Sequence, residues 1–166
     1  MFEERVLGVD PGIAATGLAV LSREDGIVSV GWAQTVRTSA GLIEAARLRR
    51  LHETVATAIR EQAVGSVAVE RVMWGRNVGS AMSVARATGV ILLAADQAGL
   101  PVEEYAPLEV KMAVTGAGNA TKEQLRHALE RMHGIRSIPD EPNAADAVAV
   151  AFCHLQQSRM RSVAKS

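Results

Sequence analysis

The fold is decided by residues 5–36, which read RVLGVDPGIAATGLAVLSREDGIVSVGWAQTV. Three apolar runs lie within this segment, at residues 5–10, 18–22 and 27–36. The sequence PGIAATG separates the first two runs, and EDG, which is typical of a tight hairpin, separates the last two. Three consecutive strands joined by short connections predict an antiparallel meander at the start of the chain.

Downstream of this meander, helical and strand patterns alternate. Residues 42–62 carry apolar side chains at helical spacing, and the run at 66–70 is apolar enough for a central strand. The other predicted elements are a strand at 101–106 and helices at 77–98, 107–114, 122–132 and 143–157. This order predicts an α/β fold with a mixed five-stranded sheet and helices on both faces.

The composition limits the classes of protein that fit. The 166 residues suffice for one domain with a hydrophobic core. Basic and acidic residues number 18 each, so DNA binding would need a local basic face, because the net charge is zero. The single Cys153 predicts no disulfide, and no run approaches the roughly 18 uncharged apolar residues that span a bilayer. We expect a cytoplasmic protein with one domain at 1–157 and a flexible basic tail at 158–166.

Three acidic side chains are predicted to meet at one edge of the sheet. Asp10 ends the first strand, Glu70 ends the fourth, and Asp146 lies near the start of the last helix. In such sheets, sites form at the carboxyl ends of strands. Clustered carboxylates repel one another unless a hard cation such as Mg²⁺ or Mn²⁺ binds them. Two such ions can activate a water and stabilise the leaving oxygen of a phosphoryl displacement, so the pattern favours a two-metal site.

Each of these residues also has a purely structural interpretation. Asp10 precedes Pro11 and Gly12 and can serve as a turn residue. Glu70 can form an ion pair with Arg71 at the sheet edge. Asn143 precedes the apolar last helix, where it can act as an N-cap with Asp146 as the acid at the third helical position.

Four segments resemble the RuvC family of Holliday junction resolvases, and together the resemblance spans about residues 5–154. They read VLGVDPGIAATGLAV, VAVERVMWGRNVGSAMSVARATGVILLAA, PVEEYAPLEVKMAVTGAGNATKEQL and NAADAVAVAFCH. The resemblance implies an RNase H-like fold, a homodimer, and paired symmetric nicking of four-way DNA junctions with divalent metal in recombination and repair. It also suggests the RuvA–RuvB branch-migration complex as a partner.

The resemblance assigns roles to particular residues. The acidic cluster of the family corresponds to Asp10, Glu70 and Asp146, and its fourth position, usually Asp and sometimes His, corresponds to Asn143. Asn can offer a carbonyl oxygen to a metal, but it cannot act as a general base. The alternative function is therefore a junction-binding protein with reduced or no catalysis.

The resemblance also implies DNA contacts. Lys111 and Lys122 correspond to lysines near the scissile phosphate, where Lys122 would take part in catalysis; the alternative for both is a solvated surface charge. The family places an aromatic residue after the second acid to hold the junction open. That position is Met73 here, with Trp74 beside it, and Arg76 adds positive charge. The alternative for Trp74 is a core or dimer-interface residue.

Three other functions compete with this one. An actin-like sugar kinase or ATPase needs two such domains, for which the chain is too short, and no P-loop motif occurs. A related nuclease acting on RNA differs in its choice of substrate. A non-catalytic junction-binding module differs in showing no nicking with Mg²⁺ or Mn²⁺.

Overall fold

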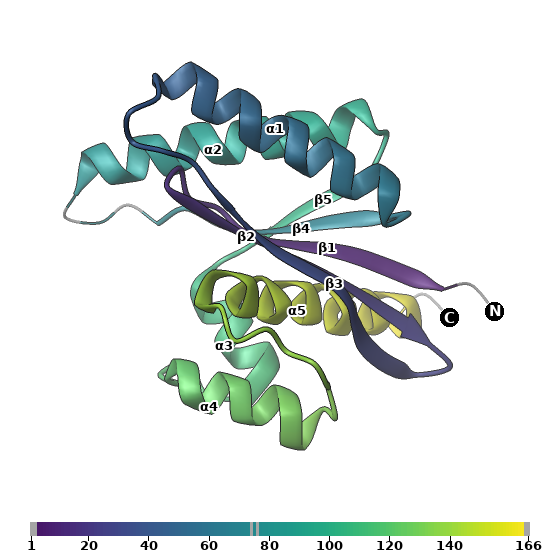
Figure 1. The fold of residues 1–166 in the computed structure, drawn as a ribbon. Coiled ribbons are helices and arrows are strands. Elements are labelled where there is room, and N and C mark those ends of the chain that lie inside the picture. The colour runs from purple at the N-terminus through teal and green to yellow at the C-terminus, as the bar shows by residue number, and fades with distance from the viewer. Residues whose placement is uncertain (1–2, 74, 76, 165–166) are drawn as a thin grey trace.

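One five-stranded sheet forms the centre of the molecule (Figure 1). A computed structural model describes residues 3–73, 75 and 77–164. The strands are β1 (Glu4–Asp10), β2 (Ala15–Glu24), β3 (Ile27–Arg37), β4 (Ser66–Glu70) and β5 (Val102–Tyr105), in the order β3-β2-β1-β4-β5. The first three are antiparallel, whereas β4 and β5 add to β1 in parallel. The predicted mixed sheet and its meander are confirmed.

Helices cover both faces of this sheet (Figure 1). On one face lie α1 (Glu44–Glu61) and α2 (Val78–Gln97). The long α5 (Pro142–Ala164) covers the other face, with α3 and α4 stacked beneath it. The outer pair are α3 (Pro107–Thr115) and α4 (Lys122–His127), and α4 continues into the π-helical η1 (Ala128–Met132). This arrangement confirms the predicted helices on both faces.

Alternation along the central strands decides where the acids point. Leu7 and Val9 belong to the core under α1 and α2, whereas Val6 belongs to the core under α5. Because successive side chains of a strand point to opposite faces, Asp10 falls on the α5 side. In β4, Val69 faces α1 and α2, so Glu70 also falls on the α5 side.

Two glycines bring α5 close to the sheet. A Cβ on Gly8 would lie 2.1 Å from the backbone oxygen of Ala147, and one on Gly17 would lie 1.8 Å from that of Asn143. Neither position can therefore hold a side chain without moving the helix. This close approach places the first turns of α5 directly over the ends of β1 and β2.

The last helix is longer than predicted. The expected end at Gln157 is wrong, because α5 continues to Ala164. Ser158 donates a 2.7 Å hydrogen bond to Glu4, and Arg161 pairs with Glu103 at 3.0 Å. Contacts with β1 and β5 therefore hold residues 158–164 in a helix where the sequence favoured a frayed tail.

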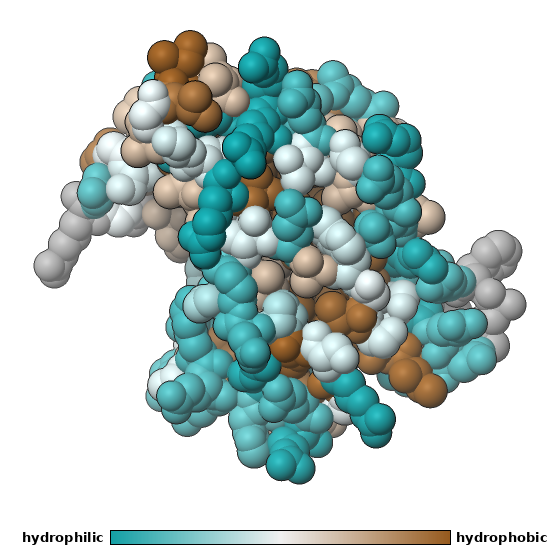
Figure 2. All heavy atoms as spheres, in the orientation of Figure 1, coloured by the Kyte–Doolittle hydropathy of each residue, from teal (hydrophilic) through white to brown (hydrophobic). Residues whose placement is uncertain are grey.

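The exposed surface is mainly polar, with local apolar groups. Figure 2 shows polar side chains over most of the visible face and an apolar group at the upper left, where α1 begins; Leu42 and Ile43 are exposed there. Among the described residues, α2 alone is long and apolar enough to span a bilayer by composition. Its inner side packs into the core through residues such as Ile91, and its Arg86 pairs with Glu44. These contacts are those of a core helix with one exposed apolar side.

Candidate active site

Asp10 and Glu70 form the inner part of the candidate site. Val9 pairs with Val69 in the parallel register of β1 and β4, so the carboxylates that follow are neighbours. Burial, the charge of Glu70 and a hydrogen bond between the two carboxyl groups raise the pKa of Asp10 to about 8. Burial also raises the pKa of Glu70, although the hydrogen bond from Asp10 acts to lower it. Burial and mutual repulsion therefore disfavour two negative charges side by side on this pair.

Asp146 and Lys122 form the outer part of the site. Lys122 Nζ lies 2.7 Å from Asp146 Oδ2, and its ammonium group is largely exposed. This hydrogen bond is the main cause that raises the pKa of Lys122. The capping box of Thr121 and Gln124 starts α4 at Lys122, and so fixes where the lysine emerges. The dipole of α4 disfavours a cation at the helix N-terminus, where Lys122 lies. The contact with Asp146 compensates for this and so explains the position of the lysine.

A cleft of about 570 Å³ connects the two parts. Its walls include all three acids, together with Asn143, Lys111 and Lys122. The structure thus brings together the acids that the sequence placed at one sheet edge. Within the described part of the chain, no three His, Cys, Asp or Glu side chains stand closely enough to hold one metal ion. In this conformation the acids form an Asp10–Glu70 pair and a separate Asp146, which pairs with Lys122.

The donor set of the cleft fits a hard divalent cation. All the candidate ligands are oxygens, which Mg²⁺ and Mn²⁺ prefer. Burial and the neighbouring charge of Glu70 raise the pKa of Asp10, and a bound cation would stabilise both carboxylates. Asp146, another carboxylate of the cleft, already pairs with the cationic Lys122. Asp10, Glu70 and Asp146 are the residues that would hold the metal.

Glu70 does not pair with Arg71, and Asn143 is not the N-cap of α5. Arg71 hydrogen-bonds to the carbonyl of Glu104 and not to Glu70. The N-cap of α5 is Glu141, whose Oε2 accepts a 2.9 Å hydrogen bond from the backbone NH of Ala144. Asn143 instead donates its side-chain NH₂ to Glu141 Oε1 at 2.9 Å.

Glu141 is the residue beside the site that sequence reasoning missed. Burial acts to raise its pKa, but hydrogen bonds from Thr35, Ala144 and Asn143 outweigh burial and lower it to about 2. Pro142 offered a signal, because proline favours the first position of a helix and so points to the residue before it as the cap. Glutamate is an unusual cap, and its partners on β3 are distant in sequence.

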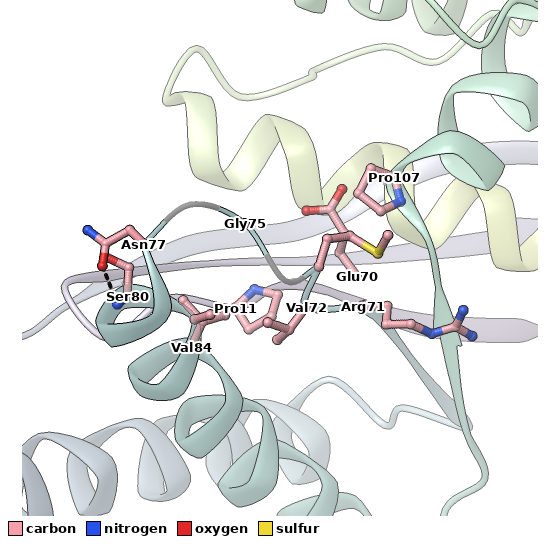
Figure 3. A pocket seen from close by; sticks show the side chains of 11 residues that line it. Pro11, Glu70, Arg71, Val72, Gly75, Asn77, Ser80, Val84 and Pro107 are labelled. Atoms are coloured by element: carbon pink, nitrogen blue, oxygen red, sulfur yellow. Dashed lines mark hydrogen bonds between the residues drawn. The ribbon is translucent and has the colours of Figure 1, made fainter.

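A second hollow, of about 450 Å³, adjoins the cleft at Glu70 and Pro107 (Figure 3). It is lined by the segment after β4 and the start of α2, and Asn77 caps that helix by accepting from Ser80 at 3.1 Å. Arg71 points away from Glu70 in this view. Met73 lines the hollow and is 60% exposed, as a residue that contacts DNA must be. The predicted DNA contacts Trp74 and Arg76 lie outside the described residues.

Comparisons with solved structures agree with this architecture. Thermus thermophilus RuvC, solved in complex with Holliday junction substrate, matches with a TM-score of 0.88 and 33% identity, over 95% of this chain and 96% of that one. The yeast mitochondrial Holliday junction resolvase Ydc2 matches with a TM-score of 0.70 and 14% identity, over 98% and 85% of the two chains, and supports the fold alone. The sheet order and the acidic strand ends define a protein of the RNase H-like class.

Comparisons of sequence narrow this class further. The family model described as crossover junction endodeoxyribonuclease RuvC matches residues 6–154. A protein of that name from Syntrophomonas wolfei is 40% identical over 98% of this chain and 94% of its own length. Another, from Roseiflexus, is 39% identical over 96% of this chain and 95% of its own length. The chain belongs to the RuvC family of crossover junction endodeoxyribonucleases.

Proposed function

We propose that this protein resolves four-way DNA junctions in recombination and repair by paired, symmetric, metal-dependent nicks. The observation that carries the proposal is the cleft, in which three carboxylates and two lysines from five different elements converge. The family match supports DNA as the substrate, and the junction-bound Thermus thermophilus relative supports a four-way junction. A purely junction-binding role is not favoured, because the similar proteins are named as nucleases.

The residues of the cleft divide the chemistry among them. Asp10, Glu70 and Asp146 would hold Mg²⁺ or Mn²⁺, two ions per site, and the metal would supply an activated water and stabilisation of the leaving oxygen. Lys122, which is exposed on one side and bound to Asp146 on the other, can bind the scissile phosphate. Lys111 also lines the cleft, and its charge opposes the rise in the pKa of Glu70 that burial causes. The two lysines provide the local basic face that a chain of zero net charge needs.

The segment after β4 supplies contacts with the bases. Met73 is exposed beside the cleft and can act as an apolar wedge at the branch point. Trp74 and Arg76 retain the roles predicted for them from sequence, as a stacking ring and as added positive charge.

A junction has two equivalent strands to cut, so symmetric nicking requires two sites related by a two-fold axis. The exposed side of α2 carries Val78, Met82 and Leu93 and offers a surface for a second copy of the chain. A homodimer in the cytoplasm, with the RuvA–RuvB branch-migration complex as a further partner, completes the proposal.

Replacing Asp10 with asparagine tests the proposed chemistry. Asp10→Asn removes one carboxylate from the inner pair, so nicking of a four-way junction in Mg²⁺ or Mn²⁺ should be lost. Junction binding should persist, because the phosphate contacts come from lysines. The matched control is Asp25→Asn, in the β2–β3 turn, where φ is +50° and asparagine is well tolerated. An Asp10→Asn protein that nicks at the native rate would overturn the assignment.

A further inference from the structure

Glu141 connects the outer strand β3 to the start of α5, the helix that carries Asp146. Its Oε1 accepts 3.0 Å and 2.9 Å hydrogen bonds from Arg37 and from the NH₂ group of Asn143. Its Oε2 accepts from the hydroxyl of Thr35 and, at 2.9 Å, from the backbone NH of Ala144. All four partners are donors, so the site requires a side chain that only accepts, which an ionised carboxylate does.

This contact decides which way the amide of Asn143 faces. A primary amide has a donor end and an acceptor end, and Glu141 binds the donor end. Asn143 also lines the acidic cleft with Asp10, Glu70 and Asp146. With the nitrogen held by Glu141, the carbonyl oxygen is the end left for the cleft.

We propose that Glu141 is a positioning residue that holds Asn143 with its side-chain oxygen towards the acidic cleft, where it acts as a neutral oxygen ligand for the metal. This inference rests on the proposed function. A carboxylate at position 143 would need no partner to orient it, because both of its terminal atoms are oxygens. An asparagine needs one, and Glu141 provides it.

The charges around Glu141 agree with this role. Arg37 forms an ion pair with Glu141 and balances its charge. An aspartate at position 143 would place a second carboxylate where the NH₂ group now lies, 2.9 Å from Glu141 Oε1. Glu141 and Asn143 are therefore matched, and exchanging donor and acceptor at both positions should preserve the contact.

The test measures Mn²⁺ binding to the intact protein without DNA, by calorimetry, alongside thermal melting. In Glu141→Gln, the single oxygen should keep the cap with Ala144, and the new NH₂ should face Asn143, while the exposed Arg37 gives up its hydrogen bond and turns to solvent. The Asn143 amide must then turn its own NH₂ into the cleft. We expect Mn²⁺ to bind about tenfold more weakly, which is typical when the hydrogen-bond partner of a ligand is lost. In the double variant Glu141→Gln/Asn143→Asp, Gln donates to Asp, and binding should return to native strength or better.

Thr35→Val is the matched control, because it removes one hydrogen bond from Glu141 and leaves the contact with Asn143 in place. We expect a lower melting temperature with native Mn²⁺ affinity. Native affinity in Glu141→Gln, or an equal loss of affinity in Thr35→Val, would refute the positioning role. If Glu141→Gln does not fold, slow exchange of an Asn143 side-chain NH in the native protein supports the contact, and fast exchange refutes it. A native protein that binds no Mn²⁺ would instead contradict the metal site of the proposed function.

Discussion

Replacing Gly17 with alanine tests whether the close approach of α5 to the sheet sets the geometry of the cleft. The new Cβ would lie 1.8 Å from the backbone oxygen of Asn143 and 2.3 Å from its carbonyl carbon. Ordinary contact begins at 3.4 Å, so the first turn of α5 would have to move by about 1.6 Å. No flexible side chain can absorb this shift, because both contacts are with backbone atoms.

Two effects of different size should follow. Overpacking of this kind costs about 1–3 kcal/mol of stability, so the melting temperature should fall but the protein should still fold. Misplacement of catalytic groups by about 1 Å can cost on the order of 100-fold in rate. Asn143 and Asp146 move with the helix turn, and therefore we expect the nicking rate to fall by about this factor.

The assay is single-turnover nicking of a four-way junction, with melting measured in parallel. The control is Gly31→Ala on β3, where a Cβ has its nearest contact at 3.8 Å, so both quantities should stay near native. A Gly17→Ala protein with native rate and native melting temperature would refute the argument that this glycine sets the position of the helix.

Three further predictions concern DNA binding, assembly and pH. Lys122→Ala should reduce the slope of log affinity for junction DNA against log salt by about 0.9, as expected for one lost phosphate contact; an unchanged slope in salt titrations would count against that role. Leu93→Arg on the exposed side of α2 should convert a dimer to monomers in sedimentation, whereas Met160→Arg, at a more exposed position on α5, should not. Burial lowers the pKa of His154, which hydrogen-bonds to Tyr105 at 2.8 Å. The unfolded chain therefore binds a proton more readily, so stability should fall as the pH drops below about 6.5, and less so in His154→Gln.

The sequence predicted the fold well because the relevant signals are local. Residues 66–70 were placed as a strand with the bounds that β4 has, since a short apolar run flanked by polar residues leaves little choice. Asp10 and Glu70 could be placed together because the carboxyl ends of neighbouring parallel strands share one edge. Asp146 followed from its position in an otherwise apolar helix.

Two features could not be read from the sequence, because their causes lie far along the chain. The role of Glu141 depends on Thr35 and Arg37, about a hundred residues away, and no local sequence pattern predicts such a contact. The helical end of α5 is stabilised by Glu4 and Glu103, whereas composition alone favoured a frayed tail. The pairing of Asp146 with Lys122 likewise emerged only in three dimensions.

The course of α5 has a consequence for how the protein can be rebuilt. Its first turns lie at the cleft, and its far end lies beside the start of β1, where Ser158 contacts Glu4 (Figure 1). The start of β1 and the end of α5 are therefore at the end of the sheet opposite the acids, about 20 Å away along the seven residues of β1. A short peptide can join them, and new ends can be opened at the Asp25–Gly26 turn, to give a circular permutant with the same cleft. Fluorophores or a second copy of the domain can also be fused at this end of the sheet, away from the cleft.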